Sequence, residues 1–206
     1  MTVLDISDTL RPHGLFIMGQ DRARILIGTD AGWWNVFTSS PEFSDQIKDP
    51  VDRWSKRILG DLATRLGAQA VFPSDGPPYA PFIAWALATG RFWQSPTGMM
   101  VHDTAGLMIS IRGVLELPTP HASTGIPTAK NPCDSCATRP CVSACPVDAL
   151  SADMAYDVPA CKAYLGASGG ADCMTQGCGV RRACPISQSF ARSDAQSAFH
   201  MKAFRG

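Results

Sequence analysis

The first 132 residues contain no cysteine, and the eight cysteines of the chain all lie between Cys133 and Cys184. Disulfide scaffolds are usually short secreted chains, so thiols confined to one end of a longer chain do not fit that class. In a reducing cytosol, clustered thiols are instead expected to bind metal. The distribution therefore predicts a cysteine-free first part and a cysteine-dense second part.

Charge imbalance and long apolar runs are also lacking. Lys plus Arg (18) equals Asp plus Glu (18), so no overall basic field would attract nucleic acid or anionic lipid. No uncharged apolar run reaches the roughly 18 residues of a membrane span. The first ten residues, MTVLDISDTL, lack the basic start and apolar core of a secretory signal. We therefore expect a cytoplasmic protein with neither a membrane nor a nucleic-acid partner.

The cysteine-free part shows mixed secondary-structure patterns. Short apolar runs with some β-branched residues predict strands over residues 13–20, 24–27 and 70–72. Residues 31–46 combine Gly, Pro and Ser with two tryptophans and are expected to be mostly loop. Residues 81–89 form a compact apolar segment that predicts a buried helix. Together these segments predict an α+β fold.

A longer amphipathic helix is predicted to begin near Asp49 and end near Gly67. Asp49 is a suitable N-cap residue, Pro50 suits the first helical position, and Asp52 places a negative charge in the first turn. Apolar residues then recur every three or four positions, as one face of a helix requires. These residues are Val51, Trp54, Ile58, Leu62 and Leu66.

Side chains alternate in character over residues 107–117, which predicts a strand with one face on a core. One predicted face carries Leu107, Ile109, Ile111, Leu115 and Leu117. The other carries Met108, Ser110, Arg112, Val114 and Glu116. Residues 119–132 are rich in Pro, Thr and Ser and predict a linker. The expected domains are therefore residues 1–118 and 133–206.

The cysteine spacing is the strongest chemical signal in the chain. Its first half reads Cys133-x2-Cys136-x4-Cys141-x3-Cys145-Pro, close to the bacterial ferredoxin run. Thiolates at such short spacing can direct several sulfurs toward one iron–sulfur cluster. The second half supplies the remaining cysteines and ends in a second Cys-Pro pair: Cys161, Cys173, Cys178 and Cys184.

Two Cys-Pro endings indicate two quasi-repeated halves that exchange their fourth ligands, so we predict two 4Fe–4S clusters. The first cluster is assigned to Cys133, Cys136, Cys141 and Cys184. The second is assigned to Cys145, Cys161, Cys173 and Cys178. Two structural zinc sites are the alternative, although zinc modules usually show paired Cys-x2-Cys knuckles and this chain has one. The clusters could also serve only to stabilise the fold of a small domain.

Two families resemble parts of this sequence. The order CDSCATRPCVSACP, CKAYL and GCGVRRACP resembles the C-terminal dicluster module of epoxyqueuosine reductase and its relatives. The first part is similar to the cblC-type cobalamin-processing family over KDPVDRW (residues 48–54) and TGMMVHDTAGLMISIRGVLELP (residues 97–118). The resemblance implies a nitroreductase- or flavin-reductase-like α+β domain followed by a small ferredoxin-like domain. Related nitroreductase-like domains often pair, so a homodimer is an implied partner state.

The cblC-type resemblance also implies a cobalamin cofactor and two residues at its site. The positions that match the family motif are His102 and Arg112, which would lie in or near the corrinoid or thiol-cosubstrate pocket. On residue chemistry alone, His102 could instead be a strand-end histidine bonded to backbone. Arg112 could be a solvated arginine on the outer face of its strand.

Three functions remain open from the sequence. The first is a corrinoid-binding oxidoreductase that receives electrons from a redox donor protein or reductant and passes them through the clusters to cobalt. The second is a ferredoxin-type electron carrier without its own catalysis, although the patterned cysteine-free part is larger than a carrier needs. The third is a tRNA-modifying relative of epoxyqueuosine reductase, which the neutral net charge disfavours.

Overall fold

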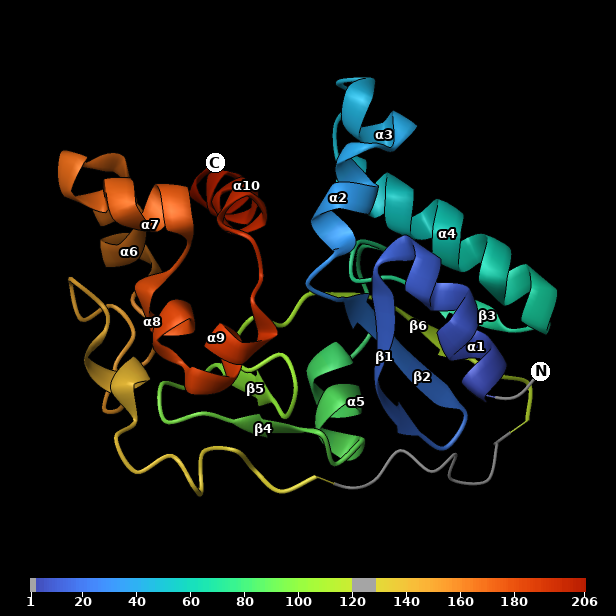
Figure 1. The fold of residues 1–206 in the computed structure, drawn as a ribbon, viewed down its shortest axis with the longest axis horizontal. Coiled ribbons are helices and arrows are strands. Elements are labelled where there is room, and N and C mark those ends of the chain that lie inside the picture. The colour runs from blue at the N-terminus through green and yellow to red at the C-terminus, as the bar shows by residue number, and fades with distance from the viewer. Residues whose placement is uncertain (1–2, 120–128) are drawn as a thin grey trace. The chain divides into compact units, whose positions relative to one another are not determined.

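The computed structural model describes residues 3–119 and 129–206, and shows a mixed α and β fold in two compact units (Figure 1). Unit 1 comprises residues 1–91 and 110–129, and unit 2 comprises residues 92–109 and 130–206. Residues 92–109, which the sequence placed in the first domain, join the cysteine-containing unit, whereas the later division, between residues 129 and 130, falls within the expected linker. Most of the expected linker, residues 120–128, lies outside the described residues.

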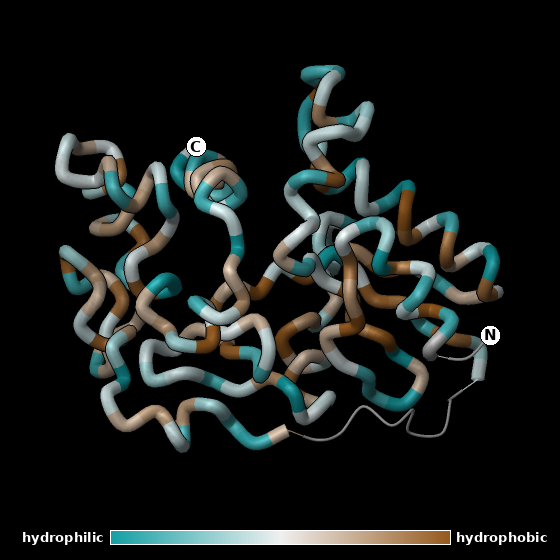
Figure 2. Tube along the Cα trace, in the orientation of Figure 1, coloured by the Kyte–Doolittle hydropathy of each residue, from teal (hydrophilic) through white to brown (hydrophobic). Residues whose placement is uncertain are grey.

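Unit 1 is built on a four-stranded antiparallel sheet with the order β1-β2-β6-β3. Its strands are β1 (Leu15–Asp21), β2 (Arg24–Thr29), β3 (Gln69–Val71) and β6 (Ile111–Glu116). The strands predicted over residues 13–20, 24–27 and 70–72 are confirmed within a few residues. Ile25, Leu26 and Ile27 are all fully buried, so both faces of β2 are covered. Figure 2 shows hydrophobic residues concentrated along the strands of this unit.

The strand expected over residues 107–117 is shorter than predicted. Strand β6 begins at Ile111, and the residues before it, through Ile109, belong to unit 2. The prediction of one buried face is also wrong, since Gly113, Val114 and Leu115 are buried in succession. Leu107 is buried as the alternation predicted, but Met108, which it placed on the opposite face, is buried as well, and both residues lie in a different unit from β6.

Helix α4 (Pro50–Leu66) confirms the amphipathic helix expected from Asp49 to Gly67. Asp49 occupies the N-cap position in the left-handed conformation (φ 55°), but its side chain makes no capping hydrogen bond, unlike the expected cap. Gly67 ends the helix, also in the left-handed conformation (φ 60°). The helix packs against β3 and β6. A Cβ added at Gly113 of β6 would lie 2.8 Å from Leu59 Cδ1, so the glycine allows this close packing. The buried face is rotated slightly from the predicted stripe and consists of Trp54, Ser55, Leu59, Leu62 and Ala63.

Residues 31–46 form two short helices rather than the predicted loop. These are α2 (Trp33–Thr38) and α3 (Pro41–Ser44), and Ser40 caps the second by accepting a hydrogen bond from Phe43 N. Trp33 is fully buried, stacks on Phe37 at a centroid distance of 4.6 Å and meets Trp54 edge-on at 5.8 Å. This aromatic packing stabilises helices that the local Gly and Pro content disfavours.

Among the described residues, unit 1 contains three further helical elements. They are α1 (Val3–Leu10), the 3-10 turn η1 (Arg11–His13) and α5 (Phe82–Ala88). Helix α5 confirms the helix predicted over residues 81–89 but not its burial. Ala86 is buried, whereas Ile83 is 63% exposed.

Unit 2 combines a two-stranded hairpin with short helices. The hairpin pairs β4 (Phe92–Gln94) with β5 (Met100–His102). The other elements are η2 (Pro140–Ser143), α6 (Val158–Gly166), η3 (Ser168–Gly170), α7 (Ala171–Gln176), α8 (Gly179–Ala183), α9 (Pro185–Phe190) and α10 (Asp194–Arg205). Across both described segments, no helix is both long enough and apolar enough to cross a membrane.

Candidate metal centre

The four cysteines assigned to the first cluster line one cavity in unit 2. Its volume is about 300 Å³, and its lining includes Cys133, Cys136, Cys141 and Cys184. The last of these lies 51 positions beyond the first, so the fold brings the second Cys-Pro pair back to the first half of the motif. The four thiols therefore lie as the predicted exchange of a fourth ligand between the two halves of the motif requires.

Three local structures position these thiols. Asn131 begins the first, because its Oδ1 accepts a hydrogen bond from Cys133 N at 3.0 Å, and Cys136 N then donates to Cys133 O at 3.3 Å. Cys141 lies within η2, directly after Pro140 at the start of that turn. Cys184 is the N-cap residue of α9, and the following proline occupies the first helical position.

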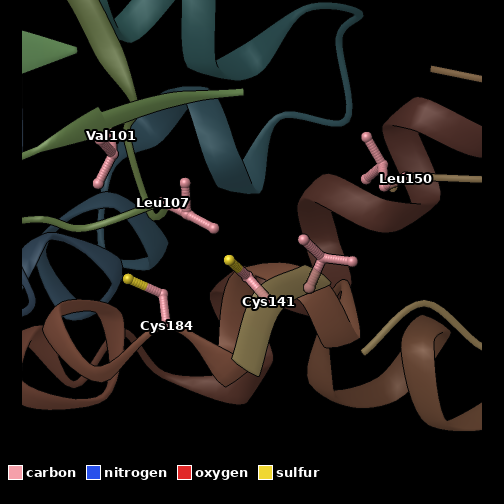
Figure 3. Close-up of a cluster of buried hydrophobic side chains, with 6 residues drawn as sticks. Val101, Leu107, Cys141, Leu150 and Cys184 are labelled. Atoms are coloured by element: carbon pink, nitrogen blue, oxygen red, sulfur yellow. The ribbon is translucent and has the colours of Figure 1, made fainter. Parts of the chain in front are cut away.

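Cys141 and Cys184 are nearly excluded from solvent, at 7% and 9% exposure. They belong to a buried cluster that also contains Val101, Leu107, Leu150 and Val180. Figure 3 shows the two cysteines gathered with Val101 and Leu107. The walls around the thiols are therefore largely apolar, which lowers the local dielectric and limits the access of water.

The thiols are close enough to influence one another's ionisation. Burial raises the pKa of Cys133, and the neighbouring Cys141, Cys184 and Cys136 raise it further. Burial and then Cys184 likewise raise the pKa of Cys141. Four thiolates cannot gather in an apolar cavity without compensating positive charge, and a bound metal group supplies such charge.

The donor set and the space fit a multi-atom metal group. Thiolates are the ligands of iron–sulfur clusters. One water molecule occupies about 30 Å³ in the liquid, so a cavity of about 300 Å³ is larger than a single ion needs. Within residues 3–119 and 129–206, no group of three or more His, Cys, Asp or Glu side chains is arranged to hold a metal ion, so the cysteines of the first set are related here by the cavity that they line.

The cysteines assigned to the second cluster lie on the helices beyond η2. Cys161 is in α6, Cys173 is buried in α7, and Cys178 is the N-cap residue of α8. Burial raises the pKa of Cys173, and the nearby Cys178 contributes in the same direction. Cys145 follows η2 in the chain.

Tyr156 and Gly179 connect members of this second set. Burial raises the pKa of Tyr156, as do a hydrogen bond to Cys161 and the charges of Cys161 and Cys178. A Cβ added at Gly179 would lie 2.9 Å from Ala144 O, so the backbone beside Cys178 closely approaches the backbone beside Cys145. Cys178 thus has Cys173 and, through Tyr156, Cys161 in its surroundings, and thiolates are donors that iron–sulfur clusters use.

His102 occupies a turn in unit 2 rather than an open pocket. It is fully buried, and its Nδ1 accepts hydrogen bonds from Thr104 N and Ala105 N, each at 3.1 Å. The same Nδ1 lies 3.3 Å from Asp103 Oδ1. His102 also packs on Phe92, with ring centroids 4.7 Å apart. This environment matches the backbone-bonded histidine that the sequence offered as the alternative to a cofactor ligand.

Arg112 lies on β6 of unit 1, so the two predicted cofactor residues belong to different compact units. Its Nε is buried and, among the residues whose placement the structure describes, has no hydrogen-bond partner. Burial lowers the pKa of the guanidinium, whereas the charge of Asp52 raises it. Arg112 as a whole is half-buried, and its Nε is the part that is excluded from solvent.

Several residues around the cysteines were not singled out from the sequence. Val101 and Leu107 line the thiol cavity, and Ser187, three positions after Cys184, accepts a hydrogen bond from Leu107 N at 2.8 Å. The alternating pattern predicted that Leu107 is buried, but it did not indicate which residues Leu107 contacts. Serine residues are too common in short helices for the sequence to predict such a contact.

Comparisons with known proteins leave this geometry as the main guide to function. No family model matches the chain. No curated protein matches it either.

Proposed function

We propose that the chain is an iron–sulfur redox protein whose unit 2 holds two 4Fe–4S clusters. The observation that carries this proposal is the shared cavity of Cys133, Cys136, Cys141 and Cys184. A bound cluster of this type supplies one-electron chemistry, over potentials that range from about −700 to +450 mV. A ferredoxin-like arrangement of unit 2 is part of the proposal, and the neighbouring positions of η2 and α8 support it.

The residues of the chain would provide ligands, shape and shielding. Cys133, Cys136, Cys141 and Cys184 would hold the first cluster, and Cys145, Cys161, Cys173 and Cys178 the second. The apolar lining would exclude water from the first cluster. Tyr156 lies beside two thiols of the second set, where a phenol hydroxyl can donate a hydrogen bond to sulfur.

The finer proposal is that unit 1 binds a corrinoid and that the protein is a reductase acting on its cobalt. Arg112 supports a ligand in unit 1, because a buried Nε without a hydrogen-bond partner is costly unless another group satisfies it. A nitroreductase- or flavin-reductase-like fold of unit 1 belongs to this proposal. The environment of His102 supports a structural role more directly than a contact with the corrinoid.

An electron carrier and a relative of epoxyqueuosine reductase remain the competing functions. Unit 1 favours an enzyme over a simple carrier, because it has its own sheet and buried core. The balanced charge favours a small-molecule substrate over tRNA. A redox donor protein or a small reductant would supply the electrons.

Metal analysis of anaerobically purified protein tests the iron–sulfur proposal. We expect about eight iron and eight sulfide per chain, with the absorption and electron paramagnetic resonance spectra of 4Fe–4S clusters. Zinc with little iron would overturn the proposal. Titration with cobalamin, followed by visible absorption, then tests the finer proposal. A spectrum of cobalamin without its lower base supports a corrinoid reductase, and no binding at high micromolar ligand supports a carrier.

A further inference from the structure

We infer that the segment 92–109, which contains the β4–β5 hairpin, forms the apolar wall of the first cluster site and controls its exposure to solvent. The inference rests on the proposed iron–sulfur function and assigns a task to a segment that ends 24 positions before the first cysteine. Val101 and Leu107 line the thiol cavity and are 0% and 1% exposed. Ser95 and Pro96, from the turn of the same hairpin, also line the cavity.

The backbone of this segment is fixed to the helix that carries a proposed ligand. Leu107 N donates to Ser187 Oγ at 2.8 Å, and Ser187 is only 2% exposed. Arg181, three positions before Cys184, donates to Leu107 O. Both polar groups of the Leu107 backbone are therefore bound by side chains on either side of Cys184. Displacement of the segment would leave these buried groups unsatisfied.

Gly106 allows the segment to approach this helix closely. Its φ is +58°, and a Cβ at this position would lie 2.4 Å from Ser187 N and 2.6 Å from Ser187 Oγ. A methyl group in that space would overlap backbone that belongs to α9 and cannot rotate away. The contact therefore requires glycine both for its backbone conformation and for its small size.

His102 organises the turn that presents Gly106 and Leu107. His102 and Gly106 exchange two backbone hydrogen bonds of 2.9 Å, and the imidazole Nδ1 accepts from the two amides between them, those of Thr104 and Ala105. The imidazole thus satisfies backbone donors inside a tight turn. We assign His102 as a positioning residue for the wall of the cluster site.

The wall has a direct consequence for a bound cluster. An apolar shell disfavours the additional negative charge of the reduced state and slows the entry of water, oxygen and chelators. Opening the wall would raise the reduction potential of the first cluster and accelerate its loss. The second cluster, whose assigned ligands do not line this cavity, would change much less.

Two glycines of the same segment provide a matched test. Gly106→Ala introduces the clash with Ser187, whereas a Cβ at Gly98 would meet only Gln94 Nε2, at 4.0 Å. Gly98 also has a positive φ (+77°), so Gly98→Ala controls for backbone strain without a clash. Both variants would be prepared anaerobically as full-length holoprotein. Circular dichroism would show whether each variant is folded.

The readouts are iron release to a chelator and the reduction potential of each cluster. We expect Gly106→Ala to release half of its iron about tenfold faster than the parent protein and to raise the potential of one cluster. Gly98→Ala should match the parent in both measurements. Equal release and unchanged potentials in folded Gly106→Ala would overturn the inference while leaving the iron–sulfur proposal intact.

A second pair keeps the inference testable if Gly106→Ala does not fold. Ser187→Ala removes the acceptor of the Leu107 amide, and Ser189→Ala removes a hydroxyl of the same helix that donates to Pro185 O. We expect faster iron release from Ser187→Ala alone. Similar release from both serine variants and the parent would overturn the inference. Parent protein that takes up no iron would instead overturn the iron–sulfur proposal itself.

Discussion

Leu107 N donates a hydrogen bond to Ser187 Oγ at 2.8 Å, across 80 positions of the sequence. Both residues are buried, and Ser187 follows Cys184 by one turn of helix α9. This contact ties a segment from the middle of the chain to a helix of the cysteine-containing part. Residues 92–109 accordingly belong to the same compact unit as residues 130–206.

Ser187→Ala should lower the free energy of unfolding by about 1–3 kcal/mol, because it leaves the buried Leu107 amide without an acceptor. Denaturant unfolding of the protein as purified anaerobically measures this change. The control is Ser189→Ala, whose hydroxyl is bonded at an exposed site and whose loss should change stability by at most about 0.5 kcal/mol. Equal effects of the two substitutions would argue against the buried contact.

Cys141→Ser and Cys184→Ser should remove the same cluster, because both thiols line one cavity. Each variant should retain about four of eight iron atoms and the same remaining paramagnetic signal. Cys173→Ser should retain about four iron atoms with the other signal. Loss of different clusters from Cys141→Ser and Cys184→Ser would contradict the exchange of ligands between the two halves.

The Glu42–Arg57 pair should make unit 1 sensitive to acid. Arg57 Nε and a second guanidinium nitrogen bind the two Glu42 carboxylate oxygens at 2.5 and 2.9 Å, and this pairing holds the pKa of Glu42 below its ordinary value of 4.5. A lowered pKa in the folded state contributes stability above 4.5, which is lost as the pH falls through the folded-state value.

Glu42→Gln should therefore reduce stability at pH 7 and weaken its decline below pH 4.5, as thermal unfolding at a series of pH values would show. Asp8→Asn is a suitable control, since its ion pair with Arg11 is largely exposed to solvent. If the thermal stability of Glu42→Gln falls with decreasing pH as steeply as that of the parent, this ion pair does not govern the acid sensitivity of the protein.

Arg112→Ala should weaken corrinoid binding about tenfold or more while the iron content stays at the parent value, because Arg112 belongs to unit 1. Absorption titration and iron analysis measure the two effects separately. Arg65→Ala, at the exposed end of α4, is the control and should bind the corrinoid as the parent does. Unchanged affinity in Arg112→Ala would remove Arg112 from the proposed site.

His102→Ala distinguishes the two assignments of His102. Loss of the bonds to the Thr104 and Ala105 amides should lower the free energy of unfolding and accelerate release of half of the iron. Corrinoid affinity should change much less than in Arg112→Ala. A variant with parental stability and iron retention but weaker corrinoid binding would favour the ligand role that the family resemblance implies.

Patterns that depend on neighbouring residues were predicted well from the sequence. Helix α4 begins at Pro50 and ends before Gly67 as expected, because a proline at the first position and a glycine after the last act over a few residues. The strands β1 and β2 form where short apolar runs occur. Residues 31–46 were not predicted, since Trp33 and Phe37 form a helix through packing with the distant Trp54.

Local caps and periodicity encode the positions of most helices and strands, and the cysteine spacing groups the eight thiols into two candidate ligand sets. Long-range packing brings Cys184 to the cavity of Cys133, Cys136 and Cys141, and adds Val101 and Leu107 to its walls. The same packing binds His102 to its own turn and buries the Nε of Arg112. The two kinds of feature differ because caps and periodicity act between near neighbours, whereas burial depends on which distant segments exclude water together.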